Sequence, residues 1–296
     1  MYPFAEQIPA LLECLRAPLW AIMDDRLEPL IAIHDQLKLG MLPVMAARDS
    51  APKSIPVSNG VAVLSVSGPI FKRPNVLTEF YGWGTSTDKL VAQLRETEAN
   101  PDVHARVLWF DSGGGEVTGS EENSAAIRAM RGSKPIEAVI QHGYSAAYWL
   151  AAAADRVTLA EQTSGAGSIG VIAVYGDLTE MYKKDGIGIK VIKSRKLKAA
   201  GNPFETMSPE DEAAIRRNID AVDFVFASAV VSHRGGRLSI QRIDALAGGT
   251  LVGREAIEAG LADRIATLDQ VVTELQDRAL SRRSLVSAFF PGTLTG

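Results

Sequence analysis

After Gly60, the apolar positions follow two different patterns along the chain. Short apolar runs of strand length are followed by longer segments in which apolar residues recur every three or four positions, as they do in helices. These runs predict strands within 61–71, 105–111, 135–143, 155–161, 168–176 and 189–194. The longer segments predict helices within 85–103, 120–132, 143–156, 178–186, 208–236 and 239–249.

Strands and helices that alternate in this way, with strands apolar throughout, are typical of a sheet covered by helices on both faces. We therefore predict an α/β fold of repeated β-α units with a mostly parallel sheet. A further strand–helix unit over 250–278 closes the pattern, and no repeat of fixed period is present.

Three regions of the chain differ in character. Residues 1–59 combine one or two short amphipathic helices with a linker rich in Pro, Ser and Ala, so we expect an N-terminal helical extension there. Residues 60–281 carry the strand–helix pattern and are expected to form one domain. Residues 282–296 are expected to be a flexible tail.

Composition narrows the class of protein. The 296 residues are 46% apolar and carry a net charge of −4, so no basic field indicates nucleic-acid binding. The single cysteine, Cys14, cannot form a disulfide within the chain. No apolar run reaches the ~18 residues of a membrane-spanning helix, and no signal-peptide pattern is present. We therefore expect a cytoplasmic protein without a membrane anchor.

Two junctions between strand and helix could carry chemistry, because ligands bind at the carboxyl ends of parallel strands. Gly113, Gly114 and Gly115 follow the strand 105–111 and leave backbone N–H groups open to a ligand, although the signature of a phosphate-binding loop is missing. Ser145 begins the helix after the strand 135–143, where unpaired N–H groups and the helix dipole stabilise negative charge. A simple helix cap is the commoner use of such a serine.

A nucleophilic serine requires a base. His142 is close in sequence, but no obvious acidic residue orients it, and the four histidines lack the spacing of metal ligands. A lysine can replace histidine as the base if it is neutral. Of the four lysines in 190–198, Lys198 has the least polar neighbours.

Three sequence blocks occur in a fixed order: DSGGGEV at 111–117, YSAAYWLAAAADRV at 144–157, and GSIGVIAVYGDLTEMYKKDGI with VIKSRKLK over 167–198. Together with LVGREAIEAGLADRI at 251–265, they resemble the Ser/Lys-dyad peptidases of the signal peptide peptidase A family. The resemblance covers about residues 60–275 and implies the Clp protease/crotonase-like fold of that family.

The resemblance implies a site as well. It places the nucleophile on Ser145 rather than Ser168, the base on Lys198, and the oxyanion donors on Gly114 or Gly115 together with the Ser145 amide. It implies no cofactor and no metal. Two departures from the family pattern stand out: Gly113 replaces the proline of the loop, and Ala146-Ala147 replace glycines that often follow the nucleophile.

The second departure, with the segments 16–25 and 198–203, resembles the bacteriophage capsid-maturation branch of the family. The implied function is a serine endopeptidase that acts on capsid, portal or scaffold proteins in the host cytoplasm, within a phage prohead. We also expect a homo-oligomer, with Phe224 and Phe226 of the long helix at or near the subunit contact. The alternatives are a signal-peptide-degrading peptidase, a crotonase-type acyl-CoA enzyme and a non-catalytic capsid assembly protein.

Overall fold

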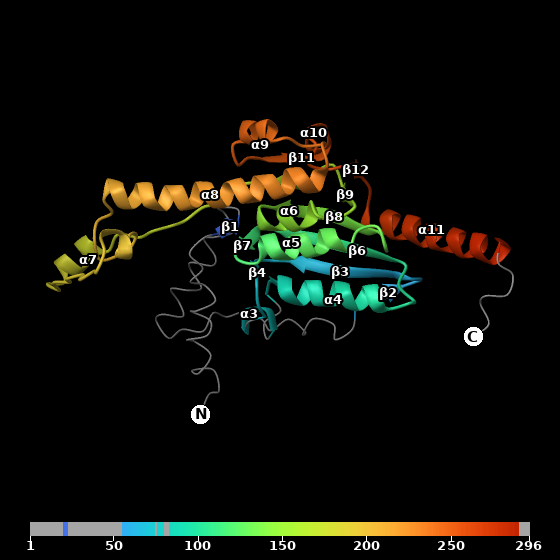
Figure 1. Ribbon diagram of the computed structural model, residues 1–296, viewed down its shortest axis with the longest axis horizontal. Helices are drawn as coiled ribbons and strands as arrows, with labels where there is room; N and C mark the ends of the chain where they lie inside the picture. Colours follow the sequence, from blue (N-terminus) through green and yellow to red (C-terminus); the bar gives the residue numbers. More distant parts are fainter. Residues whose placement is uncertain (1–19, 23–54, 75, 80–82, 290–296) are drawn as a thin grey trace, which may run out of the picture.

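A computed structural model of the chain describes residues 20–22, 55–74, 76–79 and 83–289 (Figure 1). The strands are β1 (Trp20–Ile22), β2 (Val57–Ser58), β3 (Val61–Ser67), β4 (Ile70–Phe71), β5 (Thr85–Ser86), β6 (Ala105–Ser112), β7 (Gly114–Glu116), β8 (Ile136–Tyr144), β9 (Arg156–Leu159), β10 (Gly165–Gly167), β11 (Thr250–Val252) and β12 (Arg264–Ile265). The helices are α3 (Val76–Glu79), α4 (Thr87–Ala99), α5 (Ser120–Ala129), α6 (Ala146–Ala151), α7 (Thr179–Lys184), the 3₁₀ helix η1 (Lys196–Ala199), α8 (Pro209–Arg234), α9 (Ile240–Leu246), α10 (Gly253–Glu258) and α11 (Leu268–Phe289).

The main sheet has eight strands, with β3, β6 and β8 at its centre. The pairs β3–β6, β6–β8, β8–β9, β8–β10 and β9–β12 are parallel, whereas β2 and β11 pair antiparallel with β3 and β10. Strand β8 divides its outer edge between β9, at residues 137–140, and β10, at residues 142–144. The predicted α/β class with a mostly parallel sheet is confirmed.

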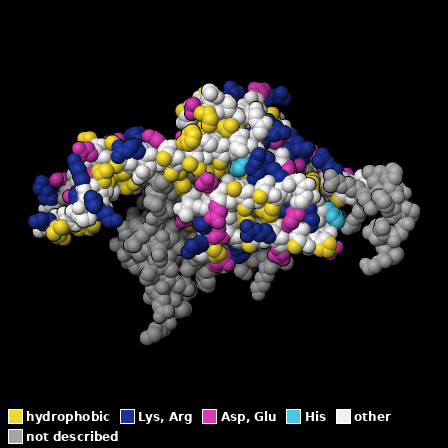
Figure 2. Space-filling model, viewed as in Figure 1, with side chains coloured by type: hydrophobic (Ala, Val, Ile, Leu, Met, Phe, Trp, Pro, Cys, Tyr) yellow, Lys and Arg dark blue, Asp and Glu magenta, His cyan; other side chains and the backbone are white. Residues whose placement is uncertain are grey.

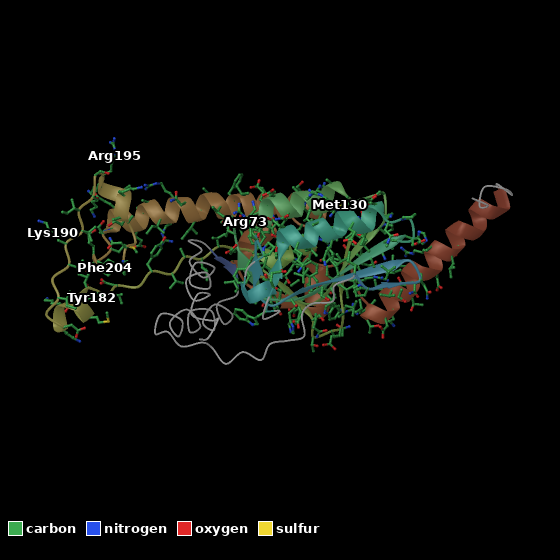
Figure 3. All side chains as sticks on the ribbon, turned by 90° about the horizontal axis from the view of Figure 1, so that it is seen from below. Arg73, Met130, Tyr182, Lys190, Arg195 and Phe204 are labelled. Atoms are coloured by element: carbon green, nitrogen blue, oxygen red, sulfur yellow. The ribbon has the colours of Figure 1, made fainter. Side chains whose placement is uncertain are left out.

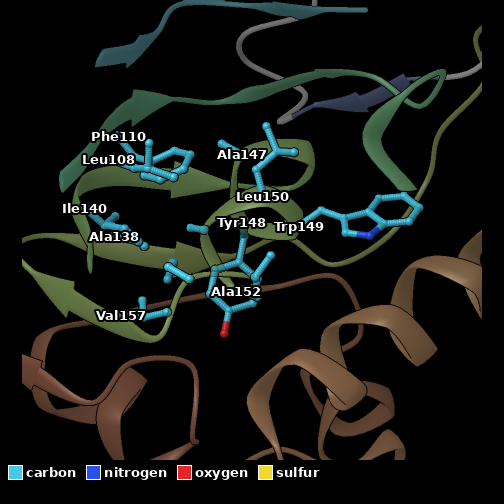
Figure 4. Close-up of a cluster of buried hydrophobic side chains, with 14 of the residues drawn as sticks. Leu108, Phe110, Ala138, Ile140, Ala147, Tyr148, Trp149, Leu150, Ala152 and Val157 are labelled. Carbon is cyan, nitrogen blue, oxygen red and sulfur yellow. The ribbon is translucent and has the colours of Figure 1, made fainter. Parts of the chain in front are cut away.

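The central strands are apolar throughout because both faces of the sheet are covered. In β6, Leu108 and Phe110 face the cluster formed with α4, α5, α6 and α8, whereas Val107 and Trp109 face α11. This alternation is the two-residue period of an extended strand. Figure 4 shows the first cluster, in which side chains of β6 and β8 meet those of α6.

Helix α6 lies inside the molecule. All six of its residues are buried, as expected of a helix that is apolar on every face. The Trp149 indole stacks on the Phe226 ring of α8, with ring centroids 4.2 Å apart and planes 7° from parallel. The Tyr148 hydroxyl donates to the Leu261 carbonyl at 2.7 Å, and burial raises the pKa of this phenol. These contacts fix the helix that follows Ser145.

A second, smaller sheet lies beside the first and has the order β1-β7-β4-β5. Its strand β7 contains two of the three loop glycines, and β4 follows the Gly68-Pro69 turn that ends β3. Strand β4 pairs parallel with β7 through Ile70 and Gly115. The small sheet therefore holds the glycine loop at the carboxyl ends of β3 and β6.

Two predicted strands do not form. Residues 168–176 are irregular apart from a single β-bridge at Ile172, and residues 189–194 are irregular throughout. Most of both segments belongs to a projecting part of the chain, residues 171–205, that we call the arm (Figures 1 and 3). Apolar patterning alone cannot make a strand, because a strand needs a neighbour to accept its backbone hydrogen bonds. Several apolar side chains of the arm are exposed instead: Val174, Tyr175, Met181, Ile187, Ile189, Ile192, Leu197 and Phe204.

Two predictions at the ends of the chain need correction. Residues 20–22, expected within a helical extension, form strand β1, because their backbone pairs with β7. Helix α11 continues to Phe289, so position 281 does not mark the start of a structureless tail. The other residues of 1–54, together with 290–296, lie outside the described residues, so the predicted extension, linker and final tail residues stay predictions there.

Candidate active site

Ser145 occupies a strained turn between β8 and α6. Its backbone has φ 53° and ψ −120°, a region that residues with a side chain rarely adopt. The Ser145 N–H donates to the Gly167 carbonyl at 2.8 Å, and the Ser145 carbonyl accepts from the Trp149 N–H at 2.9 Å. The side chain makes no capping hydrogen bond. Ser145 is therefore not an ordinary helix cap, and the fold maintains backbone strain at this residue.

The Ser145 hydroxyl is enclosed. The residue is 1% exposed, and the polar partner of Oγ is the Gly170 carbonyl at 3.5 Å. The N–H groups of Ala146 and Ala147 open helix α6, and a helix offers no internal acceptor for its first N–H groups. These N–H groups form the positive end of the helix dipole. They lie directly after the serine in the chain, so they favour negative charge beside it.

The GSIG block supports Ser145 from the neighbouring strand. Gly167, the last residue of β10, accepts the Ser145 N–H, and Ser168 has a positive φ of 51° and donates its own N–H to the Gly249 carbonyl. The Ser145 N–H is thus already engaged, so it faces the sheet rather than open space. Its predicted role as an oxyanion donor would first require that hydrogen bond to break.

The glycine loop needs glycine at two positions for two different reasons. Gly114 has φ 107°, which disfavours any side chain. A Cβ on Gly115 would lie 2.0 Å from the Ile70 carbonyl oxygen, because β4 passes directly against β7. Helix α6 packs against β7, so the loop lies beside the helix that Ser145 precedes. The Gly114 N–H points to the Ser112 hydroxyl at 3.1 Å.

A pocket of about 300 Å³ opens beside this loop. One side of it holds an ion pair that sequence reasoning missed: Nδ1 of His142 lies 2.9 Å from a carboxylate oxygen of Asp111. The expectation that no acidic residue orients His142 is therefore wrong. The two residues are register partners at the ends of β6 and β8. Their positions at the ends of adjacent parallel strands were the signal available in the sequence.

Lys198 lies away from Ser145 within one chain. It is exposed in η1, and Arg195, three residues earlier, lies toward the outer end of the arm (Figure 3). Its neighbour Lys196 pairs with Glu210 in the first turn of α8. From Glu210 to Phe226, which contacts α6, the helix rises about 24 Å at ~1.5 Å per residue. The single chain therefore holds the two predicted dyad residues on the order of 20 Å apart.

The lysines of the arm differ in their partners. Lys193 pairs with Glu205 at 2.7 Å and Lys196 with Glu210, whereas no carboxylate of the described residues lies within ion-pair distance of Lys198. The arm thus presents Lys198 as an exposed amine among exposed apolar side chains. Figure 2 shows lysine, arginine and hydrophobic side chains intermixed over this projecting part.

The described residues also bear on metals and membranes. Within 20–22, 55–74, 76–79 and 83–289, no three His, Cys, Asp or Glu side chains gather as ligands of one metal ion would. In the same part of the chain, none of the helices has the length and apolar character needed to cross a bilayer.

Comparison with known proteins decides the family. The profile of peptidase family S49 matches residues 128–281, which include Ser145, the arm and α8. The chain belongs to peptidase family S49. This S49 chain is 32% identical over 247 residues to capsid assembly protease C of Escherichia phage lambda, an alignment that covers 82% of this chain and 55% of that protein.

A second relative of the S49 chain is the head-tail preconnector protein GP5 of Enterobacteria phage P21. It is 32% identical over 217 residues, covering 73% of this chain and 43% of the relative. The chain thus spans about half the length of these two relatives. The predicted resemblance to the signal peptide peptidase type of serine peptidase is confirmed at the level of the family.

Proposed function

We propose that this S49 protein is a serine endopeptidase in which Ser145 is the nucleophile and Lys198 the base. The observation that carries the proposal is the strained backbone of Ser145 between a buried strand and a buried helix. Strain at a single polar residue on a strand-to-helix turn is how several hydrolases present a nucleophilic serine. A serine placed there merely to cap the helix would form the capping bond, and Ser145 does not.

The proposed reaction follows from these groups. Neutral Lys198 accepts the Ser145 proton while Oγ forms a bond to the scissile carbonyl carbon. The resulting oxyanion is stabilised by N–H groups of the glycine loop, Gly114 or Gly115, and by the first N–H groups of α6, for which Ala146 is the best placed. The Lys198 ammonium then protonates the leaving amine as the C–N bond breaks. Water hydrolyses the ester that remains on Ser145 and regenerates the enzyme.

The separation of Ser145 from Lys198 in one chain gives the proposal a second part. We infer that the protein is a homo-oligomer in which the arm of one subunit brings Lys198 to Ser145 of its neighbour. Two features support this inference. The arm exposes eight large apolar side chains, among them Ile192 at 86% and Val174 at 62%, which a second subunit would cover. In the part of the chain that the structure describes, its two strand-like segments also form no strand beyond a single bridge residue, Ile172.

Subunit mixing tests this arrangement. Ser145→Ala and Lys198→Ala should each lower the rate of peptide hydrolysis by at least about 10²-fold. When the two inactive variants are co-expressed in equal amounts, about a quarter of wild-type activity should return, because random assembly pairs an intact Ser145 with an intact Lys198 at that fraction of sites. Lys196→Ala, which alters the adjacent exposed lysine, is the matched control and should stay active.

The outcomes separate the two parts of the proposal. Mixtures of either single variant with the Ser145→Ala/Lys198→Ala double variant should stay inactive. If Lys198→Ala alone retains activity, Lys198 is not the base. If both single variants are inactive and their mixture recovers nothing, the dyad does not form between subunits. Labelling of wild-type protein at Ser145 by a fluorophosphonate separates a serine hydrolase from an acyl-CoA enzyme or an inactive assembly protein.

We further propose that the substrates are structural proteins of a phage head, namely capsid, portal or scaffold proteins. The support comes from the two phage relatives, one named as a capsid assembly protease and the other as a head-tail preconnector protein. Co-expression with the structural proteins encoded beside this chain, followed by mass spectrometry, should reveal cleaved products that the Ser145→Ala variant does not produce. Cleavage of signal peptides instead would identify the protein as a signal-peptide-degrading enzyme.

A further inference from the structure

One edge of β7 pairs with β4, and a distant part of the same chain pairs with the other edge. Residues Trp20–Ile22 form β1 and pair antiparallel with β7, so that Trp20 lies opposite Glu116, Ala21 opposite Gly115 and Ile22 opposite Gly114. The other edge of β7 is already paired with β4. The strand that begins with loop glycines 114 and 115 therefore has one edge available, and three residues from the N-terminal region fill it.

The side chain of Ile22 borders the pocket beside the glycine loop. Ile22 is 5% exposed, and it lines this pocket with the Gly68-Pro69 turn, Trp83 and the His142–Asp111 pair. Because β1 runs antiparallel to β7, the chain direction from Trp20 to Ile22 leads toward Gly114, the start of β7. Ile22 is thus the residue of β1 that lies opposite the loop, and its branched side chain forms part of the pocket wall.

Such an edge has the properties of a site for an extended polypeptide. An added strand gains backbone hydrogen bonds along the edge, and alternate side chains enter pockets that determine specificity. Gly114 and Gly115 have no side chains that would shield the edge from an incoming strand. At three residues, β1 is short, so the hydrogen bonds that hold it are few and another strand can replace it.

We propose that the β7 edge and this pocket form a binding site for an extended polypeptide with a branched aliphatic side chain opposite Gly114, and that Trp20–Ile22 occupy the site as an intramolecular competitor. The inference rests on the proposed function in one respect only: if the protein is a peptidase, β1 must leave before a substrate strand can bind. The binding itself requires neither Ser145 nor Lys198.

A tethered competitor should weaken binding by a measurable factor. A segment linked through the chain has an effective concentration on the order of millimolar. If the isolated segment binds with a dissociation constant on the order of 0.1 mM, its presence in the chain reduces the affinity for an outside peptide by about tenfold. Removing the Ile22 side chain from the pocket should restore that factor.

Fluorescence anisotropy with a labelled peptide RAPLWAIMDDR, residues 16–26, tests the proposal. The receptor is the full chain carrying Ser145→Ala, so the peptide cannot be cleaved. Adding Ile22→Asp to this receptor should tighten peptide binding by about tenfold, because a carboxylate at this buried position makes the pairing of β1 with the β7 edge unfavourable. The same substitution in the peptide should abolish its binding. Val57→Asp, which introduces a carboxylate on the short, exposed edge strand β2, is the matched control receptor and should leave the affinity unchanged.

Each other result contradicts the proposal. Equal affinity with and without Ile22→Asp, or no binding to either receptor, would show that β1 does not compete with a peptide. A second receptor variant, Ala21→Pro, removes a backbone N–H from β1 and keeps Ile22. If thermal melts show that both Ile22→Asp and Ala21→Pro unfold the protein, β1 is a structural strand and the proposal is wrong. A catalytically inactive wild type would overturn the proposed function and leave this binding result intact.

Discussion

At the scale of single residues, Gly115 shows how closely the small sheet is packed around the loop. Gly115→Ala would place a Cβ 2.0 Å from the Ile70 carbonyl oxygen, so β4 and β7 would have to separate. We expect this substitution to lower the free energy of unfolding by about 2–4 kcal/mol and to abolish peptide hydrolysis. Thermal unfolding and a peptide assay would measure both effects.

Gly176→Ala is the control for Gly115→Ala. Gly176 lies in the arm and does not have a positive φ, and no heavy atom of the described residues lies within 4 Å of an added Cβ. The two variants should therefore differ clearly in stability. If Gly115→Ala matched Gly176→Ala in melting temperature and activity, the close approach of β4 to β7 would not constrain the loop.

His142 is the other residue at which a different chemistry could arise, since Asp111 orients it beside the loop. We predict that His142→Ala lowers the rate of hydrolysis by less than about tenfold, because the proposed base is Lys198. Lys198→Ala should lower it by roughly 10²–10⁴-fold, the usual contribution of a general base. Steady-state kinetics on one peptide would compare the two variants. An inactive His142→Ala protein beside an active Lys198→Ala protein would assign the base to the histidine.

At the scale of elements, α8 contains a buried histidine that makes stability depend on pH. Burial, and then the charges of Arg128 and Arg131, lower the pKa of His233 to about 4 from an unfolded value near 6.5. Between these two pH values the His233 imidazole is protonated in the unfolded chain and neutral in the folded chain. The contribution of His233 to the free energy of unfolding is therefore fully present above about pH 6.5. It falls by roughly 3 kcal/mol as the pH drops toward about 4.

Urea unfolding of wild type and His233→Gln over this pH range would isolate the effect. The carboxylates contribute equally to both proteins, so the difference between the two curves belongs to His233. We expect the wild type to lose stability more steeply than the variant between about pH 6.5 and about pH 4. Parallel curves would show that His233 is protonated as easily in the folded protein as in the unfolded one.

At the scale of the whole molecule, α8 has one side in the core and another on the surface, and the two phenylalanines expected at the subunit contact lie on different sides. Phe226 is fully buried against Trp149, so the expectation that it lies at a subunit contact is wrong. Phe224 is 68% exposed and stays a candidate for that contact. The reason is the helical period, since residues two positions apart point to different sides of a helix.

Phe224→Asp is accordingly the variant that tests assembly. We expect wild-type protein to be a homo-oligomer at micromolar concentration, and Phe224→Asp to shift it toward smaller species while the chain stays folded. Multi-angle light scattering after size exclusion would measure the mass. Asn218→Asp, an added charge at another exposed position of α8, is the control and should leave the mass unchanged. A monomeric wild type would end the hypothesis.

The sequence by itself determined the elements whose residues carry their own signals. The helix expected within 85–103 is α4, which Ser86 caps, and the apolar runs of β3, β6 and β8 form the centre of the sheet. Local patterns suffice for these elements because a buried strand and a capped helix are specified by adjacent residues. The same reasoning brought out Ser145 and the three glycines.

Only the tertiary structure decided which distant residues meet. The Asp111–His142 pair depends on the register of β6 with β8, and the pairing of β1 with β7 joins segments some ninety positions apart. The apolar runs of the arm do not form the predicted strands, because a strand needs a neighbouring strand to bond its backbone and the local sequence cannot supply one. The backbone strain of Ser145 is likewise imposed from outside, through the hydrogen bond to Gly167 and the burial of α6. Contacts of this kind follow from the packing of the whole chain, so no local pattern encodes them.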